Sequence, residues 1–140
     1  MALPDSYQRL LPPMRGLAHH FYSYCKQHEL RFQKCSQCGR WRHVPREMCS
    51  DCGSFDYEWA KSSGKGQVFS WATTDQPMLP QFADAVPYAV AIVELEEGVR
   101  MATWVIDIPP DELTIGFPVE VVFDDVTIAV TLPKFRGVHG

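Results

Sequence analysis

Four of the five cysteines in this chain occur as two close pairs. Cys35 and Cys38 enclose Ser-Gln, Cys49 and Cys52 enclose Ser-Asp, and ten residues separate the two pairs. A C-x-x-C turn directs two thiolates toward one ion, and a second such turn completes a tetrahedron. The spacing therefore predicts one structural Zn²⁺ bound by these four thiolates, which leave no coordination position open for water.

A glycine directly follows each pair, at Gly39 and Gly53. Glycine adopts φ > 0 without steric cost, so the local backbone amides can turn toward the charged thiolates. The repeated pattern C-x-x-C-G is typical of a zinc ribbon. Two disulfides or a redox dithiol are the other interpretations. Disulfides require an oxidising compartment, for which the sequence carries no signal, and a redox C-x-x-C would belong to a βαβ unit and would not occur twice.

The fifth cysteine, Cys25, has two interpretations. It could be a nucleophile with His28, three residues later, as its base, or it could lie buried on the apolar face of a helix. Its register with Leu17 and Phe21 favours burial. His43 is an alternative metal ligand that four available cysteines make unnecessary. We identify no nucleophile elbow, Walker sequence or dinucleotide fingerprint, and we therefore expect no catalytic residue in this chain.

The net charge of −4 is unevenly distributed along the sequence. Residues 31–66 carry seven basic and four acidic groups, whereas residues 67–140 carry three basic and eleven acidic groups. Zinc with four thiolates carries about −2, so the basic groups of the ribbon largely compensate its own metal site. The acidic second half argues against a nucleic-acid ligand, because phosphate contacts need a positive groove.

Length and hydropathy limit the class of protein. A chain of 140 residues is one small domain or two very small modules. No stretch approaches ~18 uninterrupted apolar residues, which a membrane-spanning helix requires. The first residues, Met1 to Asp5, lack the basic and apolar regions of a signal peptide. We therefore expect a cytosolic, reduced protein without membrane association, a setting that suits thiolate–zinc ligation.

The periodicity of apolar residues predicts a helix and a ribbon in the first half of the chain. Met14, Leu17, Phe21 and Cys25 share one helical face after a Pro-Pro pair, which predicts a helix over residues 13–29. The ribbon should contain short strands at residues 30–34, 40–44 and 55–59. The polar, glycine-rich segment 61–66 is the expected connector to the second half.

Five strands are expected in the second half, at residues 67–74, 88–95, 99–106, 119–124 and 126–132. Five antiparallel strands of this size suggest a small closed Greek-key barrel, the OB-fold. The predicted fold class is therefore mainly β with an N-terminal helix. The expected divisions are a helical segment 1–29, a zinc ribbon with its connector 30–66, and an OB-fold barrel with a C-terminal tail 67–140.

Apolar residues in excess of a small core indicate a binding surface. The proline-rich loop 75–87 is long, and long loops with exposed apolar residues often make contacts. The aromatic residues of the helix and ribbon could stack bases of single-stranded nucleic acid or line a protein interface. The residues that we expect at a partner interface are Phe21, Tyr22, Tyr24, Met78, Leu79 and Phe82.

An ordered set of motifs resembles the family called domain of unknown function 35. It comprises residues 32–39 with the first cysteine pair, Pro45-Arg46, the second pair with Gly53, Glu58-Trp59 and residues 63–71. Residues 86–95, Leu113 to Val119 and Leu132 to Phe135 agree as well, so the resemblance covers about residues 12–136. This family combines a rubredoxin-like zinc ribbon with an acyl-CoA-associated OB-fold.

The resemblance implies a function as well as a fold. Family members are small subunits that accompany thiolase-superfamily enzymes or acyl-CoA hydratases. It therefore implies a non-catalytic accessory subunit of a thiolase-type complex that supports assembly and CoA-thioester handling, while the partner carries the catalytic groups. A hydratase subunit or a single-stranded nucleic-acid-binding protein is the alternative. The cations that would face the CoA phosphates are Arg40, Arg42, Arg46, Lys61 and Lys65.

Overall fold

The structure is a computed structural model that describes residues 11–12, 15–77 and 79–138. Its helix, α1, spans Gly16–Lys26 and buries Phe21 and Cys25, one turn apart, on the predicted face. The helix is shorter than the predicted range 13–29, because Arg15 is extended and His28 adopts a φ of 60°. Among the described residues, no helix is both long and apolar enough to cross a membrane.

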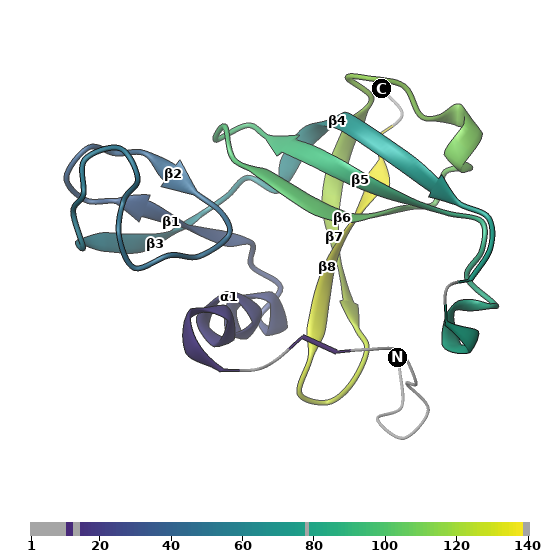
Figure 1. Cartoon of the computed structure of the whole chain (residues 1–140), viewed down its shortest axis with the longest axis horizontal. Coiled ribbons are helices and arrows are strands. Elements are labelled where there is room, and N and C mark those ends of the chain that lie inside the picture. Colours follow the sequence, from purple (N-terminus) through teal and green to yellow (C-terminus); the bar gives the residue numbers. More distant parts are fainter. Residues whose placement is uncertain (1–10, 13–14, 78, 139–140) are drawn as a thin grey trace.

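The zinc ribbon is an antiparallel sheet with the strand order β2-β1-β3. Its strands are β1 (Arg31–Cys35), β2 (Trp41–Arg42) and β3 (Tyr57–Lys61). Phe32 in β1 is fully buried, and its ring lies 6.2 Å from that of Phe21 in α1. The helix therefore packs against β1 of the ribbon and also against the barrel, and it lies between the ribbon and β8 (Figure 1).

The second half of the chain is a closed barrel with the strand order β4-β5-β6-β8-β7. Its strands are β4 (Lys65–Thr74), β5 (Tyr88–Leu95), β6 (Arg100–Ile106), β7 (Pro118–Asp125) and β8 (Thr131–Gly137). Neighbouring strands are antiparallel except for β6 and β8, which pair in parallel. This is the predicted OB-fold topology. Short 3₁₀ helices interrupt the loops, η2 (Pro80–Phe82) before β5 and η3 (Pro110–Glu112) before β7.

The prediction of the last strand was wrong. The expected strand 126–132 is a turn over most of its length, in which the N–H groups of Val126 and Thr127 both donate to the carbonyl of Val130. The strand itself begins at Thr131 and continues through Pro133. A proline normally argues against a strand, because it has no N–H to donate. Pro133 is tolerated because it precedes the point, Phe135, where β8 begins to pair with β6.

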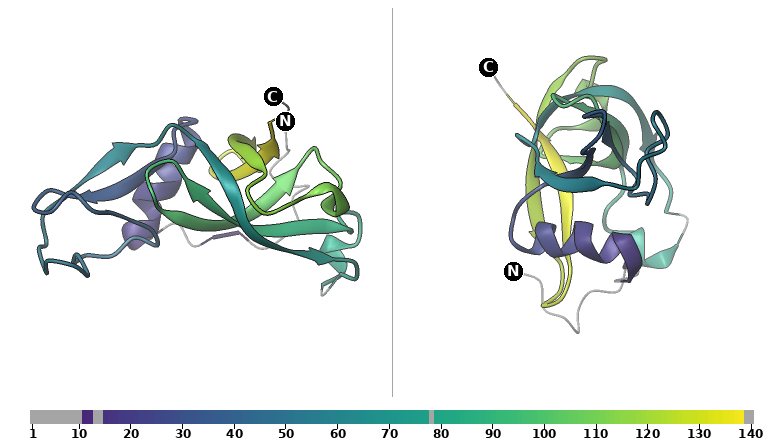
Figure 2. Two further views of the ribbon diagram at one scale, coloured as in Figure 1. Left: turned by 90° about the horizontal axis from the view of Figure 1, so that it is seen from above. Right: turned by 90° about the vertical axis from the view of Figure 1, so that its left-hand side faces the viewer.

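Two sets of contacts fix the ribbon and helix to the barrel. Ser62, in the connector, donates to a Glu97 carboxylate oxygen at 2.6 Å, and the Ser63 N–H donates to the other oxygen at 3.0 Å. At the end of α1, the His28 ring stacks on Phe123 and its Nε2 lies 3.0 Å from Asp125. The molecule is therefore elongated, with α1 beside the junction of its two parts (Figure 2).

Candidate metal centre and binding surfaces

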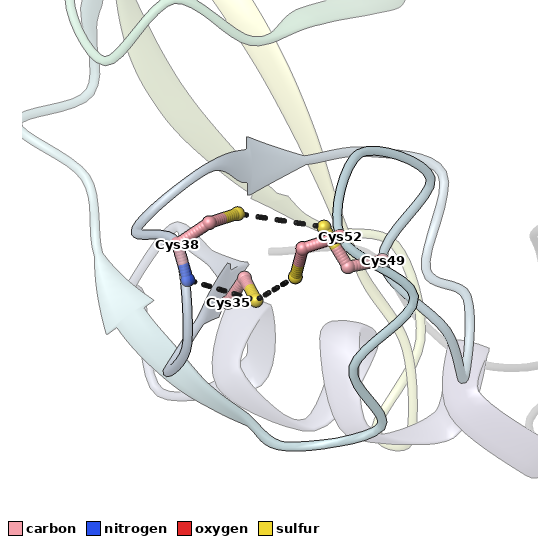
Figure 3. Close-up of side chains that lie close together, drawn as sticks. All are labelled: Cys35, Cys38, Cys49 and Cys52. Carbon is pink, nitrogen blue, oxygen red and sulfur yellow. Dashed lines mark hydrogen bonds between the residues drawn. The ribbon is translucent and has the colours of Figure 1, made fainter.

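The four paired cysteines meet at one end of the ribbon (Figure 3). All four sulfur atoms lie within 4.8 Å of one another. The Sγ atoms of Cys35 and Cys52 are 3.6 Å apart, as are those of Cys38 and Cys49. A tetrahedral zinc ion with Zn–S bonds of about 2.3 Å requires sulfur separations of about 3.8 Å. The donor set therefore fits one structural Zn²⁺ with its coordination shell closed by thiolates.

Backbone amides favour the thiolate form that zinc requires. The Cys38 N–H donates to the Cys35 sulfur at 3.5 Å, and this contact, with a smaller effect of the Gln37 amide, lowers the pKa of Cys35 to about 6. The amides of Cys52 and Asp51 likewise lower the pKa of Cys49. The turns that direct these amides inward place Gly39 at φ 80° and Gly53 at φ 76°, as the sequence predicted. In each knuckle the first cysteine is therefore favoured as a thiolate, whereas burial and the neighbouring sulfurs raise the pKa of the second, Cys38 or Cys52.

Cys25 and His28 do not form a catalytic pair. Cys25 is fully buried in α1, and burial raises the pKa of its thiol to about 12, so it is not a nucleophile at neutral pH. His28 faces the barrel instead, where Asp125 accepts from its ring and also from the Thr131 hydroxyl. The burial of Cys25 that the helical register predicted is confirmed.

His43 lies outside the group of clustered metal ligands. Its ring packs against Phe21 and Phe32, with centroid distances of 4.8 Å and 5.2 Å. Burial lowers the pKa of His43 to about 4, so the ring is neutral at physiological pH. Its Nδ1 atom is buried and finds no hydrogen-bond partner among the described residues. His43 thus belongs to the junction of helix, ribbon and barrel rather than to the metal site.

Three of the five predicted cations line one cavity of about 470 Å³ between the ribbon and the barrel. These are Arg40, Arg42 and Arg46, and the barrel adds Arg100 from the start of β6. We call this space the arginine cavity. The remaining lining residues are Trp41, His43, Val44, Ser50, Gly98 and Val99. Sequence analysis did not include Arg100, because it lies far along the sequence from the other three arginines. The sequence did show that Arg100 follows the hairpin turn at Gly98.

The other two predicted cations lie elsewhere. Lys61 ends β3, close enough to Glu29 to help lower the pKa of that carboxyl, after the larger effect of the Arg31 hydrogen bond. Lys65 begins β4 and lines a different hollow, next to Glu94 and Glu120. The structure therefore divides the predicted cations into a clustered set in the arginine cavity and two separate lysines near carboxylates.

The outer surface of the barrel carries a contiguous apolar area across β5 and β6. The inward residues of these strands are buried, so the alternate residues Tyr88, Val90, Ile92, Ala102 and Trp104 point outward. Val90 pairs with Trp104 and Ile92 with Ala102 in the strand register. The Tyr88 and Trp104 rings stack at 4.3 Å, and Phe82 of η2 approaches both. We call these six residues the docking face.

The residues predicted at a partner interface divide into several groups. Phe21, Tyr22 and Phe82 line a cavity of about 270 Å³ together with Ala102 and Trp104 of the docking face. Phe21 is only 3% exposed and serves mainly as core.

Tyr24 lies elsewhere, near Trp59 of the ribbon, where Arg31 covers its ring. Leu79 is 37% exposed at the start of η2. Met78 lies outside the described residues. The interface assignment of all these residues stays a prediction.

The strand residues of the docking face were missed in the sequence analysis, although a signal was present. Residues 88–93 are apolar at every position, whereas a strand with one solvated face alternates apolar and polar residues. Such a run indicates that both faces of the strand are covered. The barrel interior accounts for one face, and on the outer face Val90 remains 36% exposed.

Comparison with known proteins assigns both parts of the chain. Residues 23–58 match the family model of the ChsH2 rubredoxin-like zinc ribbon domain, and residues 59–124 match that of the ChsH2 C-terminal OB-fold domain. The chain is 40% identical over 116 residues to a probable enoyl-CoA hydratase alpha subunit of Thermomonospora curvata. That match covers 83% of this chain but 36% of the relative, so the chain spans about a third of that protein's length.

A second relative and a solved structure are similar over most of both chains. The chain is 40% identical over 102 residues to a DUF35 domain-containing scaffold protein of Methanothermobacter thermautotrophicus, which covers 72% of this chain and 76% of the relative. A chain of the Ltp2-ChsH2(DUF35) aldolase superposes with a TM-score of 0.82 at 37% identity, covering 90% of this chain and 98% of that one. The chain therefore belongs to the DUF35/ChsH2 family, in which a rubredoxin-like zinc ribbon precedes an OB-fold domain.

Proposed function

We propose that this chain is a non-catalytic scaffold subunit of a thiolase-superfamily enzyme complex that acts on an acyl-CoA. The docking face carries the proposal, because a contiguous apolar area on the outside of a small barrel is typical of a surface that contacts another molecule. Two relatives support the kind of partner: one is named a scaffold protein, and the other is the DUF35 chain of an aldolase that contains Ltp2.

The chemistry of the chain supports a role in assembly rather than in catalysis. The zinc site is closed by four thiolates and offers no position for an activated water. The free cysteine is buried with a raised pKa, and the nearby histidine is occupied by Asp125. The catalytic groups of the complex are then those of the partner, and this chain shapes and stabilises the assembly.

The docking face has the character of a permanent interface. It combines aliphatic residues with stacked aromatic rings, and the charged groups at its margins are already paired. Arg100 bonds to Glu94 at 3.1 Å, and Lys134 bonds to Asp124 at 2.6 Å. An obligate interface of this kind buries more than ~2,000 Å² and is largely apolar. Docking would extend from the outer face of β5 and β6 to Leu79 and Tyr22, which flank it.

An acyl-CoA hydratase is the second candidate for the partner. The observation that favours it is the name of the Thermomonospora relative, a probable enoyl-CoA hydratase alpha subunit. The same docking face would serve either enzyme, so the two candidates differ in which protein binds and not in the surface used. Co-expression with each class of enzyme separates them.

Single-stranded nucleic acid is a weaker candidate. Stacked aromatic rings on the second and third barrel strands are the position that OB-folds use for oligonucleotides. However, Lys134, the cation beside the Trp104 ring, is paired with Asp124 at 2.6 Å. Phosphate contacts supply most of the affinity for nucleic acid, and their screening makes binding fall steeply with salt. We expect no shift of a single-stranded oligonucleotide near physiological salt.

Paired charge substitutions test the proposed docking. Leu79→Asp with Val90→Asp places two carboxylates on exposed positions, 37% and 36% accessible, so the lone chain keeps its fold and its zinc. Co-expressed with its thiolase-superfamily partner, the unsubstituted chain elutes in one larger complex. The double variant elutes separately, because two buried carboxylates cost several kcal/mol (roughly 2–5) at an interface.

The matched control substitutes two apolar residues that are more exposed than Leu79 and Val90 and that lie in loops away from the docking face. Ile115, before β7, is 68% exposed, and Ile128, in the β7–β8 turn, is 76% exposed. Ile115→Asp with Ile128→Asp adds the same charge and leaves the complex intact. If both double variants release the partner, or neither does, the docking face is not the interface.

A further inference from the structure

The arginine cavity collects more positive charge than any nearby carboxylate neutralises. Its lining contains Arg40, Arg42, Arg46 and Arg100, with no acidic side chain among its described lining residues. Arg40 is paired with Asp51 at 2.6 Å, and Arg100 with Glu94 at 3.1 Å. Arg42 and Arg46 have no carboxylate partner in the described part of the chain. The cavity therefore keeps an excess of positive charge.

Buried polar atoms without a hydrogen-bond partner also occur at this place. Arg42 Nη1 and His43 Nδ1, from two residues that line the cavity, are buried without a hydrogen-bond partner in the described residues. Gln33 is fully buried, and its Nε2 is likewise unpartnered there. Its Oε1 accepts from Arg42 Nε at 3.0 Å and from the Arg46 N–H at 2.7 Å, which orients both residues. Leaving a buried donor such as Arg42 Nη1 without an acceptor is costly.

The metal site does not account for this arrangement. Asp51, and to a smaller extent the sulfurs of Cys49 and Cys38, raise the pKa of Arg40, so that arginine does compensate the thiolates. Arg100 belongs to the barrel, and its guanidinium lies 3.8 Å over the Phe69 ring. Arg42 lies over the ring of Tyr57 and bonds to the Arg46 carbonyl. Arg42 and Arg100 are therefore oriented by aromatic rings and by a backbone carbonyl, and not by direct contact with the thiolates.

We infer that the arginine cavity binds a phosphoryl oxyanion, a diphosphate or a phosphate monoester, between the ribbon and the barrel. Arg46 and Arg100 approach from the two parts of the chain, and Arg42 also lines the cavity. Guanidinium groups bind phosphate oxygens through paired, charge-assisted hydrogen bonds. The inference deepens the proposed function and rests on it for the source of the anion, since CoA carries a diphosphate and a 3′-phosphate. Lys61 and Lys65 take no part.

Titration calorimetry of the complete, zinc-loaded chain with pyrophosphate tests the site. The expected result is one pyrophosphate per chain, with an affinity that weakens as salt increases. Arg46→Gln and Arg100→Gln should each raise Kd about tenfold, the effect of losing one charged hydrogen bond. Lys61→Gln and Lys65→Gln remove the same charge outside the cavity and should change Kd less than about twofold by screening. Zinc content and melting temperature of each variant report on its fold.

The possible results distinguish specific binding in the arginine cavity from non-specific electrostatic attraction of an anion to the chain. Equal weakening by all four substitutions, or no binding to the unsubstituted chain, overturns the inference. CoA, dephospho-CoA and inorganic phosphate are then used as competitors. Displacement of pyrophosphate by CoA and dephospho-CoA identifies the diphosphate of CoA as the ligand, and displacement by CoA alone identifies the 3′-phosphate. Displacement only by inorganic phosphate overturns CoA as the source.

The same variants distinguish this inference from the proposed function. Arg46 and Arg100 lie outside the docking face. The Arg46→Gln and Arg100→Gln variants should therefore still elute with the partner enzyme. A chain that binds the partner but no pyrophosphate contradicts the anion site alone. A chain that binds pyrophosphate with the expected variant pattern but no thiolase or hydratase contradicts the proposed function alone.

Discussion

The cysteines of the metal site differ in exposure in a regular way. The first of each pair, Cys35 and Cys49, is buried, and the second, Cys38 and Cys52, is exposed. Backbone amides lower the pKa at all four sulfurs, but burial and the neighbouring sulfurs leave the pKa raised at Cys38 and Cys52 and lowered only at Cys35 and Cys49. Binding energy of a structural zinc ion is folding energy, because the unfolded chain has no assembled site.

Cys49→Ser should therefore abolish zinc binding and unfold the ribbon. The protein is expected to contain less than about 0.1 zinc per chain after gel filtration, since a hydroxyl is a poor replacement for a thiolate ligand. Metal analysis by mass spectrometry measures this directly. Cys25→Ala is the control, because Cys25 lies in the helix core and should keep one zinc per chain. Equal zinc in both variants would refute the assignment of the ligands.

His43 gives the fold a specific dependence on pH. Its pKa is about 4 in the folded protein and 6.5 ordinarily, so between these values the unfolded chain binds a proton that the folded chain does not. Stability from a neutral, buried histidine is complete above pH ~6.5 and is lost as the pH falls toward 4. The loss over this window is up to about 3 kcal/mol.

His43→Phe should remove this part of the acid sensitivity. Phenylalanine fits beside Phe21 and Phe32, and the unpartnered Nδ1 means that no hydrogen bond of that atom is lost among the described residues. Denaturant unfolding of the zinc-loaded proteins should give similar stabilities at pH 7.5 and a more stable variant at pH 5. Acid release of zinc lowers the stability of both proteins, so the difference between their free energies of unfolding reports the effect of the histidine. Parallel pH profiles would contradict the account.

At the scale of elements, local pattern predicted most of the fold. The two C-x-x-C-G turns, the apolar face of α1 and the strands β5 and β6 were visible because each depends on residues close in sequence. The position of β8 was not, since Val126 and Val130 resemble strand residues but close a turn, and Pro133 resembles a strand breaker. Only the pairing with β6 and β7 explains why that proline is tolerated.

The residues that line the arginine cavity could not all be predicted from local sequence pattern, because the cavity depends on the tertiary arrangement of the ribbon and the barrel. Arg40, Arg42 and Arg46 were recognised as a basic group, but their partner Arg100 enters the cavity through the barrel topology. Lys61 and Lys65 were equally basic in the sequence and are separated from the cavity by the path of the connector. Charge alone could not distinguish the two sets, because the distinction depends on how ribbon and barrel are oriented.

The connector between β3 and β4 should be the element that fixes this orientation. Glu97 accepts from the buried Ser62 hydroxyl and from the Ser63 N–H, whereas Glu96 accepts only from the exposed Ser63 hydroxyl among these groups. Glu97→Ala should destabilise the protein by about 1–3 kcal/mol, the cost of leaving partners of a charged hydrogen bond unsatisfied. Glu96→Ala should cost less than about 1 kcal/mol.

Denaturant unfolding and limited proteolysis of the connector measure this difference. Only Glu97→Ala should expose residues 62–64 to cleavage while zinc stays bound. If Glu96→Ala and Glu97→Ala behave alike, or if neither changes the rate of cleavage, the connector does not hold the ribbon against the barrel through Glu97.

At the scale of the whole molecule, the chain separates three tasks. Zinc holds the ribbon, the arginine cavity lies where ribbon and barrel meet, and the docking face covers the outside of β5 and β6. The interior of the barrel is filled by its own side chains, so these surfaces lie on the outside and at the junction. Under the proposed function, this arrangement would position a partner and a shared ligand, and the partner would supply the reacting groups.

The central claim, that this chain is a required but non-catalytic subunit, is tested most directly by acyl-CoA turnover with three samples: the chain alone, its thiolase-superfamily partner alone, and the two co-purified. The account predicts no turnover by the zinc-loaded chain, little or none by the partner, and full activity in the complex. It also predicts that the Leu79→Asp and Val90→Asp double variant lowers the activity of the mixture toward that of the partner alone. Turnover by the isolated chain, or a partner that is fully active without it, would contradict the account.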